Sequence, residues 1–312
     1  MRARTTAVPE VSVVVAAHDQ ARWIGDAIES VRAQTFADWE LVVVDDGSTD
    51  GTADVARRHA AADARIRCLV QPRSERSVAR NRGIAATSAP LVAFLDADDR
   101  WQREKLSHQV TALAAEPAAG FCYTVARFVG PSDEPLPIRK PPRPLAGDVF
   151  ATLLRGNVII LASVVARRAC LDAVGGFDPV LAPHGCEDWD LWLRLARRWP
   201  VVAVDEELTL YRRHPGNTGW ERVLDGALMV IDRWFDDPET AARAGLTRRA
   251  ARARHFLTNA AWVACDDRRA ALALALRALR EAPATVLTRP GAAAAAALVF
   301  PRVLVRALRA AG

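Results

Sequence analysis

The chain has 312 residues, of which 51% are hydrophobic, and this is enough to bury the core of one large domain or of two smaller ones. Its formal net charge of +5 comes from dispersed arginines without a dense basic block, so we expect no nucleic-acid partner. The five cysteines are odd in number and lack Cys-x-x-Cys spacing, which argues against a disulfide framework and a zinc site. The first residues contain neither a secretory signal nor a membrane-spanning run, and we expect a cytoplasmic protein.

Alternating strands and helices are predicted over the first hundred residues. The β-branched run Val11–Val15 predicts a buried first strand, and apolar residues at helical spacing predict a helix over residues 21–33. Further strands are predicted at Leu41–Val44, Cys68–Val70 and Leu91–Leu95. This alternation predicts an α/β fold with a mainly parallel sheet and right-handed crossovers. In such sheets, ligands bind at the carboxyl ends of the strands.

Three carboxylates, those of Asp96, Asp98 and Asp99, follow the predicted strand Leu91–Leu95 directly. Like charges this close raise one another's pKa, so an ordered site of this kind favours a cation between them. Asp96 and Asp98 share a face if the segment stays extended, and Mg²⁺ commonly takes one or two carboxylates together with phosphate oxygens. The alternative is a solvated acidic turn that caps a helix predicted to begin near Trp101.

Charged side chains from separate segments fall on this same predicted sheet edge. His18 follows the first strand, Asp45 and Asp46 follow the second, and residues 96–99 follow the strand at Leu91–Leu95. The positive charges expected beside these acidic loops are Arg73, Arg76, Arg80 and Arg82. Such convergence in one cleft favours a bound ligand over a solvated acidic turn.

Five short motifs follow one another along the chain. They are Val11-Ser12-Val13-Val14-Val15, Gln34-Thr35, Val44-Asp45-Asp46-Gly47-Ser48-Thr49-Asp50-Gly51-Thr52, Ala79-Arg80-Asn81-Arg82-Gly83 and Asp96-Ala97-Asp98-Asp99. Together they resemble family 2 glycosyltransferases, which are inverting enzymes of the GT-A fold, and the resemblance covers about residues 10 to 215. The sequence departs from the family pattern at Ala16-Ala17-His18-Asp19 and at Arg73-Ser74-Glu75, two segments that the resemblance places near the nucleotide.

The resemblance implies a transferase that uses a nucleotide-diphospho-sugar donor and a divalent cation, Mn²⁺ or Mg²⁺. It implies that Asp45 or Asp46 contacts the base and that Arg80 supports that carboxylate. It also implies that Asp96 faces the ribose and that Asp98 binds the metal. The remaining nucleotide contacts that it implies are Ala17, His18, Asp19 and Ala97.

The acceptor side of the resemblance lies at the start of a predicted amphipathic helix. Asp188 is implied as the general base, because inversion needs a positioned carboxylate to take the proton of the acceptor. Glu187 is expected to orient the acceptor or the loop. The alternative for all three carboxylates is a charge that favours the dipole at the helix N-terminus, and we interpret Asp190 in that way. Farther along, the resemblance implies that His214 and its basic neighbours Arg212 and Arg213 lie near the metal or the diphosphate, and the alternative is an exposed histidine without that role.

Two more strands are predicted before that helix, at Gly120–Arg127 and within Gly156–Val165. The intervening chain is rich in proline, which disfavours regular helix, and we predict a surface excursion within residues 116–149. Both strands are expected to extend the sheet towards the acceptor.

The composition changes after Asn217 to alanine, leucine and arginine at helical spacing. We therefore predict a catalytic domain over residues 1–217 and a helical C-terminal region over residues 218–312. The last apolar stretch, residues 292–305, is interrupted by a proline and an arginine and is too short to span a bilayer. It is expected either to pack on protein or to lie peripherally on the inner face of a membrane, with arginines meeting acidic headgroups.

Together these features predict the GT-A nucleotide-diphospho-sugar transferase fold, a Rossmann-like, mainly parallel sheet flanked by helices. The predicted function is transfer of a sugar, with inversion, to the hydroxyl of a glycan, lipid-linked or small-molecule acceptor in the synthesis of cell-surface polysaccharide, glycolipid or glycoconjugate. A nucleotide-sugar-binding protein without transferase activity is the alternative. A dinucleotide-dependent oxidoreductase is disfavoured, because Val15 is followed by Ala16-Ala17-His18 and not by a Gly-x-Gly-x-x-Gly turn.

Overall fold

The computed structural model of the chain describes residues 8–141, 144–264 and 267–287. The chain divides into two compact units, and each is built from separate segments. Unit 1 consists of Met1–Asp148, Ile159–Pro179 and Arg194–Arg213, and unit 2 of Val149–Val158, Val180–Leu193 and His214–Gly312. Two segments of unit 2 therefore precede the domain boundary predicted at residue 217, which stays a prediction.

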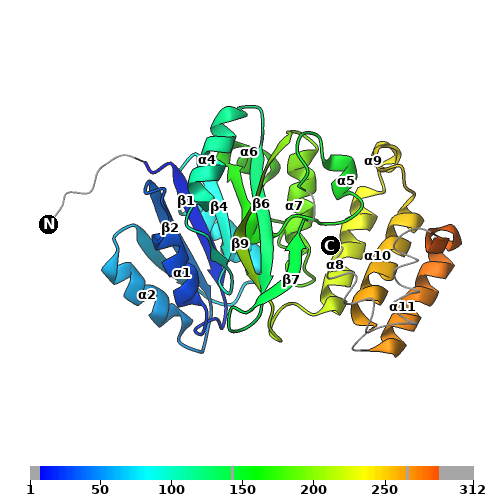
Figure 1. Cartoon of the computed structure of the whole chain (residues 1–312), viewed down its shortest axis with the longest axis horizontal. Helices are drawn as coiled ribbons and strands as arrows, with labels where there is room; N and C mark the ends of the chain where they lie inside the picture. The colour runs from blue at the N-terminus through cyan, green and yellow to red at the C-terminus, as the bar shows by residue number, and fades with distance from the viewer. Residues whose placement is uncertain (1–7, 142–143, 265–266, 288–312) are drawn as a thin grey trace. The chain divides into compact units, whose positions relative to one another are not determined.

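Unit 1 is built on one mixed sheet, to which the described residues contribute nine strands (Figure 1). They are β1 (Val11–Ala17), β2 (Trp39–Asp46), β3 (Ile66–Gln71), β4 (Leu91–Asp96), β5 (Arg100–Trp101), β6 (Phe121–Val129), β7 (Pro135–Lys140), β8 (Val164–Arg167) and β9 (Val201–Arg212). Their order is β3-β2-β1-β4-β8-β6-β9-β5, with β7 beside β6. Strands β1 to β4 are parallel to one another, whereas β8 runs antiparallel to both of its neighbours.

Helices cover both faces of this sheet. They are α1 (Ile24–Arg32), α2 (Thr52–Ala62), α3 (Arg76–Ala85), α4 (Lys105–Ala115), the single turn η1 (Leu161–Ser163) and α6 (Arg168–Val174). Because strand side chains alternate, Val13 and Val15 join a core with α1 and α4, whereas Val14 faces α3. A Cβ atom on Gly83 of α3 would lie 2.4 Å from Cγ1 of Val14, so this helix approaches the sheet as closely as only a glycine allows.

The structure corrects the sequence prediction in three segments of unit 1. The helix predicted to begin near Trp101 begins instead at Lys105, because Arg100 and Trp101 pair with β9 as a short strand. The strand predicted within Gly156–Val165 begins only at Val164, after the turn η1. The proline-rich excursion contains the strand β7, which pairs with β6.

Unit 2 is helical, in agreement with the helical region predicted for the C-terminal part of the chain. Its elements are α5 (Phe150–Leu153), α7 (Glu187–Ala196, of which the last residues count with unit 1), α8 (Trp220–Trp234), α9 (Pro238–Ala244), α10 (Arg248–Val263), α11 (Arg268–Glu281) and η2 (Pro283–Leu287). Phe256, Leu257 and Leu274 belong to the core that α8, α10 and α11 share (Figure 1). The apolar stretch 292–305 lies outside the described residues, and no described helix is long and apolar enough to cross a membrane.

Candidate functional site

Asp46 and Asp96 lie on the same face of the sheet, at the carboxyl ends of β2 and β4. Ala16 of β1 is in register with both Val44 and Asp96. Ala16 and Val44 pack in the apolar cluster that also contains Ala79 of α3. Side chains two residues apart on a strand share a face, so Asp46 lies on the α3 face of the sheet together with Asp96. The same alternation places Asp45 on the opposite face.

Arg80 of α3 holds the carboxylate of Asp96. Its Nη2 donates to Oδ1 of Asp96 at 2.8 Å, and only 8% of the Arg80 side chain is exposed. The guanidinium carbon of Arg80 also lies 5.3 Å from the ring centroid of Phe177. Asn81 fixes Phe177, because its Nδ2 donates to the Phe177 carbonyl and its Oδ1 accepts from the Phe177 N–H. Arg80 was expected to support the Asp45 or Asp46 carboxylate; the hydrogen bond described here goes to Asp96, and support of the base-binding carboxylate stays a prediction.

The carboxylate of Asp46 is buried and is bound by the segment that follows β3. It accepts hydrogen bonds from Nε2 of Gln71 at 2.7 Å, from the N–H of Ser74 at 2.9 Å and from Nη1 of Arg73 at 2.9 Å. Gly47 has φ +75°, and a Cβ atom there would lie 2.8 Å from the backbone nitrogen of Arg73. A glycine after Asp46 therefore allows the loop that carries Arg73 to close over this carboxylate.

The loops that follow β1 and β2 are joined by hydrogen bonds. Nδ1 of His18 lies 3.0 Å from the carbonyl oxygen of Asp46, and Oδ1 of Asp19 accepts from the N–H of Thr49 at 2.8 Å. Asp45 is buried, and its Oδ2 accepts from the N–H of Ser48 at 3.3 Å. Ala17, at the end of β1, and Ala97 are also buried. The structure thus brings these predicted nucleotide contacts to one sheet edge, and their contact with a nucleotide stays a prediction.

The carboxylates of Asp98 and Asp99 lie in the turn after β4, because the strand ends at Asp96. Arg212, which is 1% exposed, holds this turn: its Nε donates to the Asp98 carbonyl at 2.9 Å and its N–H donates to Oδ1 of Asp99 at 2.8 Å. Burial, together with the nearby charges of Asp98 and Asp96, raises the pKa of Asp99 well above its usual range. The carboxylates of Asp98 and Asp96 thus add negative charge around this turn, which favours a cation there.

A divalent cation fits this turn if other groups complete its coordination shell. Asp96 is paired with Arg80 and Asp99 is fully buried, so Asp98 is the half-buried carboxylate of the turn that is best placed to reach an ion. Within the described part of the chain, no group of three or more His, Cys, Asp or Glu side chains is arranged to hold a metal ion. A hard cation that also binds a diphosphate needs only one or two protein carboxylates, and Asp98 meets that requirement.

His214, the other residue predicted near the metal, belongs to unit 2. Its N–H donates to Oδ1 of Asn217 at 2.7 Å, and its Nδ1 accepts from the N–H of Gly216 at 3.1 Å. These bonds fix the ring in a local turn. A metal-binding role of His214 stays a prediction.

Asp188 lies in the first turn of α7 in unit 2 and is half-buried. Nδ2 of Asn157 donates to its Oδ2 at 3.0 Å, and the N–H of Trp189 donates to its Oδ1 at 2.7 Å. The Trp189 side chain is buried, and its Nε1 donates to the Leu153 carbonyl at 2.7 Å. Asp188 is therefore a positioned, partly accessible carboxylate, as proton transfer requires.

Glu187 and Asp190, on either side of Asp188, are both buried. Oδ1 of Asp190 accepts from Nε1 of Trp234 at 3.1 Å and pairs with Nη1 of Arg233 at 3.3 Å. The interpretation of Asp190 as a helix-dipole charge is therefore incomplete, because its carboxylate also joins α7 to α8.

The structure gives specific partners to two residues whose contacts the sequence did not predict. Asn157 holds the Asp188 carboxylate, and Arg212 holds the Asp98–Asp99 turn. The resemblance implied that Arg212, a basic neighbour of His214, lies near the metal or the diphosphate, and buried arginines commonly pair with carboxylates. The sequence around Asn157 contains no comparable signal.

Comparison with known sequences finds relatives among the glycosyltransferases. The family model described as glycosyl transferase family 2 matches residues 12–160. An uncharacterized glycosyltransferase of Nostoc sp. is 31% identical over 220 residues, which cover 67% of this chain and 66% of the relative. The putative teichuronic acid biosynthesis glycosyltransferase TuaG of Bacillus subtilis is 34% identical over 129 residues, 41% of this chain and 51% of the relative. The chain thus spans less than two thirds of the length of these relatives.

Solved structures share the fold over nearly the whole chain. The mannosyltransferase PcManGT of Pyrobaculum calidifontis, solved with GDP-Man and Mn²⁺, has a TM-score of 0.58 at 20% identity and covers 95% of this chain and 89% of its own. Residues 1–349 of S. aureus TarS have a TM-score of 0.60 at 16% identity and cover 97% and 92%. These similarities establish the predicted GT-A fold. Through residues 12–160, the chain belongs to glycosyl transferase family 2.

Proposed function

We propose that the chain is a metal-dependent, inverting glycosyltransferase that moves a sugar from a nucleotide-diphospho-sugar donor to an acceptor hydroxyl. The observation that carries this proposal is the group formed by Asp46, Arg80 and Asp96 on the α3 face of the sheet, beside the acidic turn that contains Asp98. TarS has been solved with UDP-GlcNAc and PcManGT with GDP-Man, which supports a nucleotide-sugar donor. The name of TuaG supports an acceptor in cell-surface polysaccharide synthesis.

Asp46, and not Asp45, is the residue that we assign to the nucleotide base. It shares its sheet face with Asp96, whereas Asp45 lies on the other face against the turn at Ser48. A carboxylate accepts from the ring N–H of a base, and charged hydrogen bonds of this kind are among the stronger ones in proteins. Asp96, held by Arg80, is then placed to accept from the ribose hydroxyls.

Asp98 would hold the divalent cation, which when bound offsets the charge that develops on the departing nucleoside diphosphate. Asp188 takes the proton of the acceptor hydroxyl, and Asn157 keeps its carboxylate oriented for that transfer. The acceptor oxygen forms a bond to the anomeric carbon as the bond from that carbon to the diphosphate oxygen breaks. Attack from the face opposite the leaving group inverts the anomeric centre, and Glu187 is assigned to orienting the acceptor.

Calorimetric titration with a panel of nucleoside diphosphates tests the donor half of this proposal. One nucleoside diphosphate should bind in the presence of Mn²⁺ and bind far more weakly without it, and Asp98→Asn should remove this metal dependence. Asp46→Asn should weaken binding by about 10-fold or more, because one charged hydrogen bond contributes about 1.5–3 kcal/mol. The matched control is Asp45→Asn on the opposite sheet face, which should bind nearly as wild type. Equal losses in the two variants, or no binding of any member of the panel, would contradict the assignment.

A nucleotide-sugar-binding protein without transferase activity is the second candidate. Such a protein would give the same calorimetric results but would not cleave the nucleotide sugar. Release of nucleoside diphosphate from the intact nucleotide sugar, with acceptor or slowly with water, separates the two functions. Tight donor binding without any release would favour the second candidate.

A further inference from the structure

Helix α11 has one face buried against the helical core of unit 2 and one face open to solvent. Ala271, Leu274 and Ala278 form the buried face. Asp267 caps the helix by accepting from the N–H groups of Arg269 and Ala270. Because the cap and the buried face fix the orientation of the helix, they determine which of its side chains face solvent.

Three leucines occupy the open face of α11. Leu272 is 53% exposed, Leu276 is 46% exposed and Leu279 is 42% exposed. Their spacing of four and three residues places them on one side of the helix, as a continuous apolar stripe. Single exposed leucines are common on protein surfaces, but aligned ones indicate a surface that something apolar covers.

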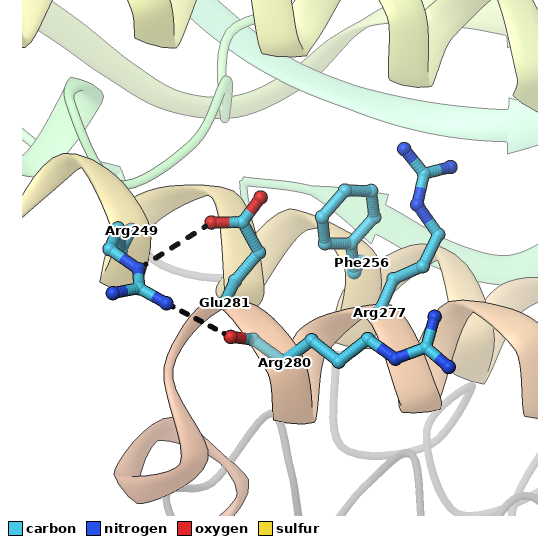
Figure 2. Close-up of a pocket in the computed structure, with 5 residues that line it drawn as sticks. All are labelled: Arg249, Phe256, Arg277, Arg280 and Glu281. Carbon is cyan, nitrogen blue, oxygen red and sulfur yellow. Dashed lines mark hydrogen bonds and ion pairs between the residues drawn. The ribbon is translucent and has the colours of Figure 1, made fainter.

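Side chains of α10 and α11 line a cationic pocket (Figure 2). Arg249 and Phe256 of α10 line it together with Arg277, Arg280 and Glu281 of α11, and its volume is about 360 Å³. Arg280 follows Leu276 by four residues, so the pocket and the leucine stripe adjoin on the helix surface.

The charges of the pocket are unbalanced. Nε of Arg249 lies 3.9 Å from Oε2 of Glu281, while Oε1 of the same carboxylate accepts from Nε of Arg252. The guanidinium carbon of Arg277 lies 4.4 Å from the ring centroid of Phe256. Among the residues that the structure describes, no carboxylate pairs with Arg277 or Arg280, so the pocket offers two uncompensated guanidinium groups to an anion.

We propose that these side chains form a docking surface for an anionic lipid bilayer, and we call them the α11 surface: Arg249, Leu272, Leu276, Arg277, Leu279 and Arg280. The guanidinium groups bind headgroup phosphates, and the leucines enter the boundary of the acyl chains. A soluble phosphate would use the arginines but leave the leucine stripe in water, whereas an acidic leaflet complements both. The inference goes beyond the transferase function and does not depend on it.

Sedimentation of the full chain with vesicles tests this surface directly. The wild type should bind vesicles that contain phosphatidylglycerol, bind pure phosphatidylcholine vesicles far more weakly, and lose most of its binding at about 1 M salt, where the Debye length is about 3 Å. Arg277→Gln with Arg280→Gln should weaken binding by about 25-fold, because each arginine near an acidic leaflet contributes a factor of about five.

Two further variants make the test specific. Leu276→Ser with Leu279→Ser should weaken vesicle binding by at least about 10-fold, because their apolar area would no longer leave water. The control, Arg57→Gln with Arg58→Gln on the exposed side of α2, should bind as wild type. Circular dichroism verifies that each variant is folded.

Three results would overturn the proposal. They are equal binding to phosphatidylcholine vesicles, unchanged binding of the arginine or leucine variants, and a wild type that binds inorganic phosphate in calorimetry but no vesicles. The last result would identify the pocket as a site for a soluble anion.

Discussion

Replacing Lys105 with methionine should remove most of the rise in stability that we expect for the wild type between pH 7 and pH 9. Lys105 begins α4 and is completely buried. Its Nζ donates to Oε1 of Gln109 at 2.6 Å and lies 4.0 Å from the ring centroid of Trp101. Burial lowers the pKa of this lysine from 10.5 to about 7.

The sign and size of the effect follow from proton linkage. Below pH 7 the amine is charged in both states, and the folded state carries the full cost of burying the charge. Between pH 7 and pH 10.5 the folded state has released its proton while the unfolded state keeps it, so the free energy of unfolding rises with pH. The limiting slope is about 1.4 kcal/mol per pH unit, which gives a gain of about 2 kcal/mol from pH 7 to pH 9.

Urea unfolding at pH 7, 8 and 9 measures this gain in the wild type and in Lys105→Met. The difference in unfolding free energy between them should change by about 2 kcal/mol over this range, with the wild type gaining relative to the variant. Lys140→Met, at the only other lysine of the sequence, is the control, and its unfolding free energy should change with pH as that of the wild type does. If the unfolding free energy of Lys105→Met changes with pH as that of the wild type does, Lys105 is charged in the folded state from pH 7 to pH 9, and the reasoning fails.

Three further predictions concern the surroundings of Asp188 in unit 2. Gly226→Ala should lower the melting temperature in scanning calorimetry, because its Cβ atom would lie 2.2 Å from the carbonyl oxygen of Gly185, and an unchanged value would contradict this contact. Asp190→Ala should destabilise the fold by about 1–3 kcal/mol in urea, since it removes the acceptor of the hydrogen bond that the buried Nε1 of Trp234 donates, and a neutral effect would contradict the role of Asp190 in joining α7 to α8. Asn157→Ala should lower turnover by roughly 10-fold or more with donor affinity unchanged, which steady-state rates and calorimetry together can check.

The first half of the sheet could be predicted because its signal is local. Val11–Val15, Leu41–Val44 and Leu91–Leu95 are runs of buried residues whose types alone favour strands, and β1, β2 and β4 extend them by at most two residues at either end. The positions of β5 and β8 depend on partners far along the chain. No local pattern carries that information, and the helix was therefore predicted to start near Trp101 and not at Lys105.

The residues of the site were easier to predict than the hydrogen bonds between them. Carboxylates after consecutive parallel strands must meet at one sheet edge, so Asp46, Asp96 and Asp98 could be predicted as a group. The partner of Arg80 depends on which face of the sheet α3 covers, and the hydrogen bond from Asn157 to Asp188 depends on the folding of two separate segments of unit 2. Such pairings follow from tertiary packing and not from residue type.

The rate of sugar transfer by Asp188→Asn tests the central claim most directly, once the donor that the wild type uses is identified. The amide keeps the shape of the side chain but takes no proton, so turnover should fall by about 10² to 10⁴. Donor affinity should stay close to that of the wild type, and Asp225→Asn, at an exposed position of α8, should keep full activity. A folded Asp188→Asn protein that binds donor and transfers sugar within a few-fold of the wild-type rate would contradict the account and make Glu187 the next candidate for the base.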